Sequence, residues 1–511
     1  MLRSFLLVVG MAWLSIAFAQ TFNKRFDFFS EGEGEGTFSV EVLSDSSALV
    51  FVNRAYTLDS VYYGSGVSTV TVSGDGQFGE GYRLHIPDRF SFVGWVNCST
   101  PLDTGGFVVF GSNAAAGDVH YATLYWMTNE GVVVHYQELA LPGPAWIARG
   151  GARCADNSLV LVGEKSNGPD LDAFLVKTDA QGNVLWVRTY GDPTLREGLN
   201  SVALAPWGGY YLGSSREVSP GNYEPYIIRV DDMGFVIGQE DYPGPYQGSL
   251  DARLTLAPDG GVWVAGGHNV ALGPEGRRAT IYKVAQDGTL LWRKLYGPTS
   301  RTGLFTVQEV PGSTDLVAAG FNDSQAFGGG ITGVLLRTTA TGDSLWMRSY
   351  AYSDNLLTNG NSGFYDMQPT PDGGFIAVGF TYYAFLPDTT YSQDVWVVKV
   401  DSMGCLEPGC HLVTGMETQI TNLRDALKVA PNPVASGGNV QVRIDLPEGF
   451  TAQGALRITV TDAAGRLVQE QPAPSGVSAF SFPLSTFSPG LYHLHLHDAS
   501  RWISGAKLIV D

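Results

Sequence analysis

Short apolar runs that end in a small residue recur at regular intervals along the chain. Six of these runs end in glycine, and successive copies are 50 to 59 residues apart. The glycines are Gly111, Gly163, Gly213, Gly266, Gly320 and Gly379. A weaker copy, Leu49 to Asn53, precedes them at a similar distance and makes seven units. Self-similarity at this period predicts a repeat architecture.

Each unit continues with two β-rich runs that flank a tight turn. In the clearest copy, Ala173–Thr178 leads into a turn ending at Gly182, and Val184–Tyr190 follows. Alternating side chains on both sides of Asp- and Gly-containing turns predict antiparallel hairpins. With the short run before each turn, such as Ser201–Ala205, every unit holds four strands.

Four strands in about 50 residues are typical of a β-propeller blade. We therefore predict an all-β fold with a seven-bladed β-propeller over residues 20–410. The last unit reaches Cys405 without a fourth strand, whereas Phe22–Phe28 is a strand without a unit. We expect this N-terminal strand to complete the last blade and close the ring. The alternative is a two-sheet sandwich with insertions.

A different pattern begins after the propeller. Residues 411–425 are polar without strand periodicity and are interpreted as a linker. Residues 426–511 contain six or seven short alternating strands, which predict a small Ig-like β-sandwich.

Composition and charge narrow the function classes. The chain has 44% hydrophobic and 16% charged residues, so it is not a disordered chain. A net charge of −19 argues against nucleic-acid binding. Arg3, the apolar run Phe5–Ile16 and the small residues at Ala17–Ala19 predict a signal peptide over residues 1–19, with a buried N-terminal helix as the alternative. No transmembrane segment is expected in the mature chain.

The four cysteines belong to an exported chain and can oxidise. Cys405 and Cys410 enclose a short turn-forming loop, so we predict a disulfide between them. Cys98 and Cys154 pair only if the fold brings their strands together, and this question stays open.

Four motifs near the C-terminus occur in a fixed order. They are Pro431-Asn432-Pro433, Asp462 with Gly465-Arg466, Gly490 with Tyr492, and the terminal Lys507–Val510 strand. In these features the module resembles the type A C-terminal sorting domain of the type IX secretion system. The resemblance implies export by the type IX machinery to the outside or the outer cell surface, often with removal of the domain. A generic carbohydrate-binding or fibronectin-like sandwich is the alternative.

The repeats also resemble those of secreted propeller-like proteins of the Bacteroidetes group. Asp372-Gly-Gly-Phe375 and the Lys177…Asp179…Gly182…Trp186 spacing carry this resemblance. It covers residues 100 to 405 well and the first unit poorly.

Candidate chemistry in the propeller is sparse. No nucleophile elbow, P-loop, zinc-protease helix or calcium loop occurs, so we expect no cofactor and no metal. Asp179, Asp231 and Asp401 are interpreted as turn formers, and Trp186, Trp292 and Trp346 as packing residues. His493, His495 and His497 share one strand face, where an exposed polar surface is favoured over a metal site.

Propellers bind ligands at the mouth of the central channel, where the innermost strands begin. By register, the residues there are Arg149, Asn200, Asp251, Arg253 and Asp366. We favour a binding module for an extracellular polymer or protein over an enzyme. The alternative is a polysaccharide hydrolase or lyase, in which Asp251 and Asp366 could form a carboxylate pair.

Overall fold

The computed structural model describes most of the chain after residue 20. The segments outside the description are 1–20, 28–33, 45, 59–61, 97, 116–118, 144, 167–170, 193–194, 220–221, 245–252, 271–275, 299–300, 325–329, 353–360, 385–390, 408, 411–416, 421–422, 424–425, 447–449, 453, 475–477, 485–486 and 500. The predicted signal peptide lies outside the described residues. Every named regular element is a β-strand, so the all-β class is confirmed. Among the described residues, no helix is long and apolar enough to cross a membrane.

Three consecutive units form separate four-stranded antiparallel sheets in which neighbouring strands follow one another along the chain. The first contains β11 (Trp146–Arg153), β12 (Leu159–Ser166), β13 (Leu171–Thr178) and β14 (Val184–Tyr190). The second contains β15 (Ser201–Leu204), β16 (Tyr210–Ser219), β17 (Asn222–Val230) and β18 (Val236–Asp241). The third contains β19 (Arg253–Leu256), β20 (Val262–Asn269), β21 (Arg277–Val284) and β22 (Leu290–Tyr296).

The units that flank these three sheets are joined into larger sheets. A five-stranded sheet contains β6 (Phe90–Val93), β7 (Ser99–Pro101), β8 (Phe107–Ala115), β9 (Val119–Met127) and β10 (Val133–Glu138). An eight-stranded sheet joins the two ends of the repeat region. Its strands are β1 (Phe22–Phe26), β2 (Gly34–Val42), β3 (Ala48–Leu58), β4 (Tyr62–Val72), β5 (Tyr82–Arg83), β27 (Ser362–Pro369), β28 (Phe375–Ala384) and β29 (Tyr391–Val400).

The N-terminal strand completes the sheet of the last unit, as predicted. β1 runs antiparallel to β29, and its register pairs Phe22 with Lys399 and Phe26 with Val395. The sheet β27-β28-β29-β1 therefore has four strands like the middle units, although its fourth strand comes from the other end of the chain.

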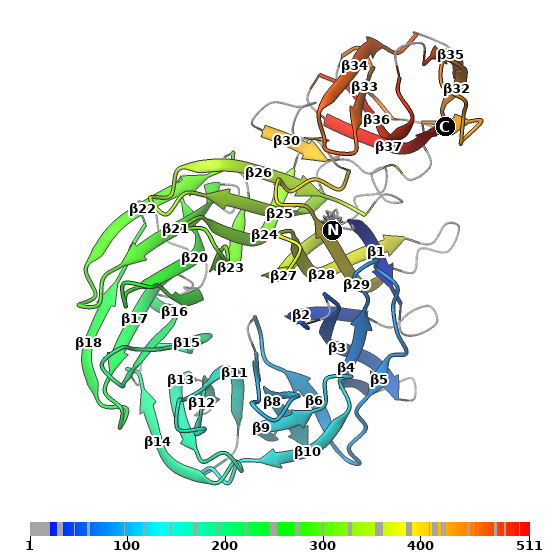
Figure 1. The fold of residues 1–511 in the computed structure, drawn as a ribbon. Coiled ribbons are helices and arrows are strands. Elements are labelled where there is room, and N and C mark those ends of the chain that lie inside the picture. Colours follow the sequence, from blue (N-terminus) through cyan, green and yellow to red (C-terminus); the bar gives the residue numbers. More distant parts are fainter. Residues whose placement is uncertain are drawn as a thin grey trace, which may run out of the picture.

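The sheets stand around a common centre, which gives the repeat region a β-propeller-like form (Figure 1). Innermost strands of successive units contact one another from β11 through β15, β19 and the next inner strand β23 to β27. Each sheet is covered by a neighbour on both faces. The run Leu159–Val162 in β12 is accordingly buried without alternation, at no more than 1% exposure.

The glycine that ends each apolar run has a packing reason. A Cβ at Gly163 would overlap the carbonyl oxygen of Ile147 in the innermost strand, and Gly320 and Gly379 stand in the same relation to Gly303 and Gly363. Only glycine permits this close approach of the two backbones.

A second repeated contact joins each unit to the next. The tyrosine that ends the outermost strand donates a hydrogen bond to a glycine carbonyl in the turn of the following unit, at 2.7 to 2.8 Å. The four pairs are Tyr190–Gly234, Tyr242–Gly288, Tyr296–Gly342 and Tyr350–Gly404. Trp186, Trp292 and Trp346 lie against the same glycines, where a Cβ would come within 2.8 to 2.9 Å of their rings.

The predicted turn-forming aspartates also cap these turns. Asp179, Asp231 and Asp401 each accept backbone N–H groups two and four residues further along.

The C-terminal unit continues the sheet of the sixth repeat. That sheet contains β23 (Gly303–Glu309), β24 (Leu316–Ser324), β25 (Gly330–Thr338), β26 (Ser344–Tyr350), β30 (Glu417–Ile420), β37 (Arg501–Val510), β36 (Gly490–His497), β33 (Arg457–Asp462) and β34 (Leu467–Pro472). A three-stranded sheet contains β31 (Leu427–Ala430), β32 (Asn439–Ile444) and β35 (Ala479–Pro483). One apolar core that includes Val440, Val460, Phe482 and Leu494 joins the two C-terminal sheets. Within the segment interpreted as a linker, β30 pairs with both β26 and β37.

Candidate ligand-binding site

The innermost strands of four units contain a β-bulge close to where the facing apolar run ends. In each bulge, one extra residue lies between two residues that pair regularly with the next strand. The extra residues are Phe38 in β2, Arg149 in β11, Phe305 in β23 and Tyr365 in β27. A bulge turns its extra side chain out of the regular alternation. Asn200, directly before β15, lies at the equivalent place and donates its backbone N–H to the Gly213 carbonyl at 3.0 Å.

Aromatic side chains gather over three neighbouring units of this rim. The Tyr365 ring lies 4.7 Å from that of Phe38, 5.1 Å from that of Phe305 and 5.5 Å from that of Phe380. Phe321 and Tyr382 extend the group, each 5.5 Å from a member. All six side chains are half-buried. We call this set the aromatic arc.

A pocket of about 270 Å³ opens on the side of β12 and β16. Its polar and aromatic lining consists of Trp95, Glu164, Arg196, Glu197, Asn200, Ser214, Ser215 and Tyr223. We call it the polar pocket. Asn200 is buried and donates its side-chain amide to the Ser214 hydroxyl at 2.8 Å. Its amide oxygen has no hydrogen-bond partner among the described residues and is available to a ligand.

Trp95 connects the polar pocket with the centre of the ring. The guanidinium group of Arg149 lies 4.7 Å from the Trp95 ring centre, and that of Arg253 lies 5.2 Å away. Because β15 separates β11 from β19 around the ring, a side chain that reaches both arginines lies in the space enclosed by the innermost strands. Burial raises the pKa of Tyr365, and the positive charge of Arg253 opposes part of that rise, which places Arg253 near the aromatic arc.

The two carboxylates of the polar pocket have different surroundings. Glu164 forms an ion pair with Arg149 at 3.1 Å. Glu197 is buried; its carboxylate accepts the backbone N–H of Asp192 at 2.8 Å and lies 3.7 Å from Arg216. Burial raises the pKa of Glu197 despite these partners. Arg196 in the same pocket is exposed and forms no ion pair with any described residue.

The structure places three of the five predicted channel residues at this rim. Arg149 and Arg253 stack on Trp95, and Asn200 lines the polar pocket. Asp251 lies outside the described residues.

Asp366 is not at the channel mouth. Its side chain is fully buried between units and accepts hydrogen bonds from the Ser39 hydroxyl at 3.0 Å and the Val40 N–H at 3.1 Å. The bulge in β27 explains the difference, because the extra residue gives the rim position to Tyr365 and turns Asp366 inward.

Sequence reasoning missed the aromatic arc, although a signal was present. Phe305 and Tyr365 lie 15 and 14 residues before the glycine that ends their units' apolar runs, and Arg149 lies 14 before its own. A constant offset from the repeat glycine would have found the rim without the strand register.

The predicted exposed face of the three C-terminal histidines is wrong. His493, His495 and His497 are at most 4% exposed. The imidazole of His495 lies between the Thr461 hydroxyl at 3.1 Å and the Trp502 indole N–H at 3.0 Å. Within the described part of the chain, no group of three His, Cys, Asp or Glu side chains has the arrangement of a metal site.

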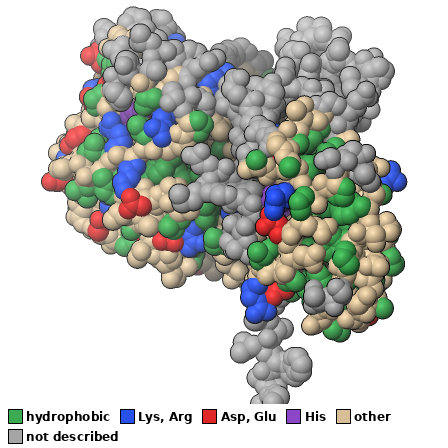
Figure 2. Space-filling model, turned by 90° about the horizontal axis from the view of Figure 1, so that it is seen from above, with side chains coloured by type: hydrophobic (Ala, Val, Ile, Leu, Met, Phe, Trp, Pro, Cys, Tyr) green, Lys and Arg blue, Asp and Glu red, His purple; other side chains and the backbone are tan. Residues whose placement is uncertain are grey.

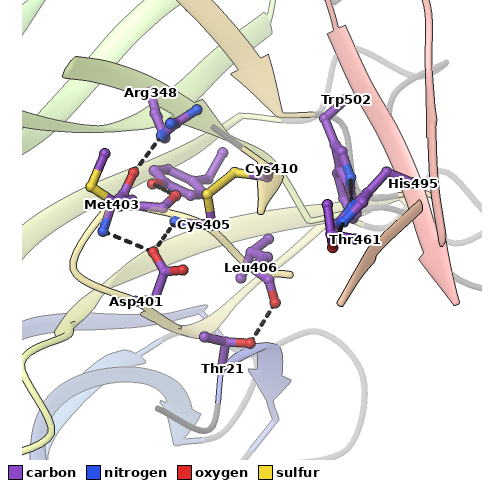
Figure 3. The surroundings of a disulfide bond; sticks show 12 residues. Thr21, Arg348, Asp401, Met403, Cys405, Leu406, Cys410, Thr461, His495 and Trp502 are labelled. Carbon is purple, nitrogen blue, oxygen red and sulfur yellow. Dashed lines mark hydrogen bonds between the residues drawn. A yellow bond between two sulfur atoms is a disulfide. The ribbon is translucent and has the colours of Figure 1, made fainter. Parts of the chain in front are cut away.

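The predicted disulfide between Cys405 and Cys410 is confirmed (Figure 3). Cys98 and Cys154 are both free thiols. The face of the molecule in Figure 2 carries Lys and Arg side chains interspersed with Asp and Glu.

Several residues of the C-terminal motifs form one connected structure. Asn432 donates to the Lys507 carbonyl at 2.7 Å and accepts the Ile509 N–H at 2.9 Å, which fastens the Pro-Asn-Pro segment to the last strand. Asp462 accepts the Arg466 backbone N–H at 2.9 Å around the turn at Gly465, and it pairs with Tyr492 in the sheet.

Comparisons with known proteins identify the C-terminal module. Residues 428–511 match the family described as the secretion system C-terminal sorting domain. A search of curated proteins gave no match.

Solved structures resemble the repeat region at low identity. An α-L-arabinanase from Penicillium chrysogenum is 12% identical with a TM-score of 0.40, covering 75% of this chain and 98% of its own. Sqt1 from Chaetomium thermophilum is 12% identical with a TM-score of 0.41, covering 75% and 98%. An ulvan lyase is 7% identical with a TM-score of 0.48, covering 74% and 96%. Likenesses at these scores do not bear on the activity of this protein. The sorting domain, by contrast, indicates a protein that the type IX system exports, and the chain is therefore secreted or located at the cell surface.

Proposed function

We propose that the exported protein is a seven-bladed β-propeller over residues 20–410, joined through residues 411–425 to an Ig-like sorting domain over residues 426–511. The signal peptide of residues 1–19 would begin export, and the type IX machinery would be the partner of the sorting domain. The four-stranded sheets and the pairing of β1 with β29 support this architecture.

The function that the site supports best is carbohydrate binding at the rim of the central channel. The observation that carries this proposal is the presence of the aromatic arc and the polar pocket on the same rim, linked by Trp95 and Arg253. Aromatic rings provide large apolar contact surfaces for sugar rings. The Asn200 amide, the Ser214 and Ser215 hydroxyls and the exposed Arg196 offer polar groups that orient a ligand.

A glycan array with the purified protein tests this proposal. We expect binding that falls at least tenfold in Tyr365→Ala and in Asn200→Ala, because each removes a contact group from one half of the rim. Tyr136→Ala is the matched control, since Tyr136 lies on the outermost strand β10 and is 40% exposed. Absence of glycan binding, or equal binding by all three variants, would contradict the proposal, and a protein ligand would then become the binding partner to seek.

A glycoside hydrolase is the second candidate, and the two carboxylates of the polar pocket favour it. Glu164 beside Arg149 is held ionised, whereas burial favours the protonated form of Glu197. Different protonation in one pocket is the requirement for a general base and a general acid. Release of reducing ends from a polysaccharide panel, abolished in Glu197→Gln with binding retained, would establish this function. Binding without release would leave the binding module alone.

A further inference from the structure

One face of the sorting domain is polar and yet buried. Along β36 the core positions are Tyr492, Leu494 and Leu496, so the alternating histidines lie on the opposite face of the sheet. Thr459, Thr461 and Trp502 lie with them, and none of the six side chains is more than 4% exposed. We call this set the histidine face. In a free two-sheet domain this outer face would be in contact with water.

The loop closed by the Cys405–Cys410 disulfide lies against the histidine face (Figure 3). The Glu407 carboxylate lies 3.1 Å from Nδ1 of His493. Glycines on both sides permit a close approach: a Cβ at Gly409 would lie 2.7 Å from the Thr461 side chain, and one at Gly505 would lie 2.8 Å from that of Glu407. Trp502 belongs to the same buried apolar cluster as Leu406 and both cysteines.

The loop is itself anchored in the last propeller unit. Asp401 accepts the Cys405 N–H at 2.8 Å, and Arg348 donates to the Met403 carbonyl at 2.8 Å. Thr21, directly before β1, donates its hydroxyl to the Leu406 carbonyl. The disulfide adds a covalent closure to a segment of six residues that has no regular secondary structure.

The contact has a defined border on the sorting domain. Leu491 precedes His493 on the same face of β36 and is 37% exposed. Ile509, its partner in β37, is 45% exposed, and Leu467, paired with Thr461, is 54% exposed. The buried area is therefore the part of the face opposite the loop, whereas the end that carries the sorting motifs stays open.

We infer that the Cys405–Cys410 loop is a docking seat for the sorting domain, and that the seat forms only when its disulfide is oxidised. The partner that fits this surface is the histidine face of the chain's own sorting domain. Docking therefore follows transfer to an oxidising compartment, and it presents the domain to the export machinery with its motif end uncovered.

Hydrogen exchange and small-angle scattering of the full-length protein test this inference. In Cys405→Ser/Cys410→Ser, we expect peptides of β36 and β37 to exchange at least tenfold faster and the radius of gyration to rise. The sheets β11–β14 and β19–β22 should keep their protection. Cys98→Ser/Cys154→Ser is the matched control, because both thiols are free, and it should behave like the wild type.

Two further samples cover the case in which the serine variant does not fold. Reduction of the wild-type protein should release β36 and β37, and reoxidation should restore their protection. Gly505→Leu should release them with the disulfide intact, because its side chain would overlap Glu407. Unchanged protection of β36 and β37 in the reduced protein would overturn the inference. Equal loss of protection throughout the propeller would also overturn it, since the disulfide would then be a general stabiliser.

Discussion

The tyrosine–glycine contacts between successive units allow a quantitative test of how the ring is held together. Tyr190, Tyr242, Tyr296 and Tyr350 each donate one hydrogen bond of 2.7 to 2.8 Å to the next unit. Replacement by Phe keeps the ring and removes only the hydroxyl. Each substitution should reduce the free energy of unfolding by about 1 kcal/mol, the usual net contribution of a hydrogen bond.

The four contacts share no residue, so their effects should add. The quadruple Phe variant should lose about 4 kcal/mol, measured by urea unfolding followed by tryptophan fluorescence, or by unfolding rates if refolding is incomplete. Tyr136→Phe is the control, because that side chain is 40% exposed and its hydroxyl can bond water.

A pH series gives a second measurement of the same contacts. Burial raises the pKa values of these four tyrosines above the ordinary value of 10. The folded state therefore keeps protons that the unfolded state loses above about pH 10. Wild-type stability should fall as pH rises above that value, and the quadruple variant should show a smaller decrease. A quadruple variant within about 0.5 kcal/mol of the wild type would refute the role of these contacts.

Three further predictions concern single residues. Burial raises the pKa of Asp366 to about 7, so the folded state binds an extra proton above about pH 4, and stability should fall as pH rises from 5 to 8; Asp366→Asn should flatten this profile in urea unfolding. Trp502→Ala should cost about 3 to 5 kcal/mol and should appear in calorimetry as a separate, earlier transition of the sorting domain; a single unchanged transition would contradict it. Arg253→Ala should weaken glycan binding at least fivefold by removing the stack on Trp95, whereas Arg443→Ala, at an exposed site of the sorting domain, should leave affinity unchanged.

Features that depend on residues close together in the sequence were predicted well. The turn aspartates and the disulfide each involve partners within five positions, so spacing and residue type are sufficient to identify them. The sorting motifs were likewise visible as local patterns. The pairing of β1 with β29 was the exception over long range, because a missing strand at one end and a spare strand at the other left one combination.

Features that depend on register or on a distant surface were not predictable in the same way. A single extra residue in β27 exchanges Asp366 for Tyr365 at the rim, and no alternation pattern reveals a bulge that glycine packing in the facing strand produces. The three histidines have the pattern of an exposed face, and they are buried only because a loop more than 80 residues earlier covers them. The sequence by itself determined the repeat, its turns and the export module, since these follow from local chemistry. Only the tertiary structure decided which side chains line the channel and which face of the sorting domain is covered, because both depend on contacts between segments that are far apart in the chain.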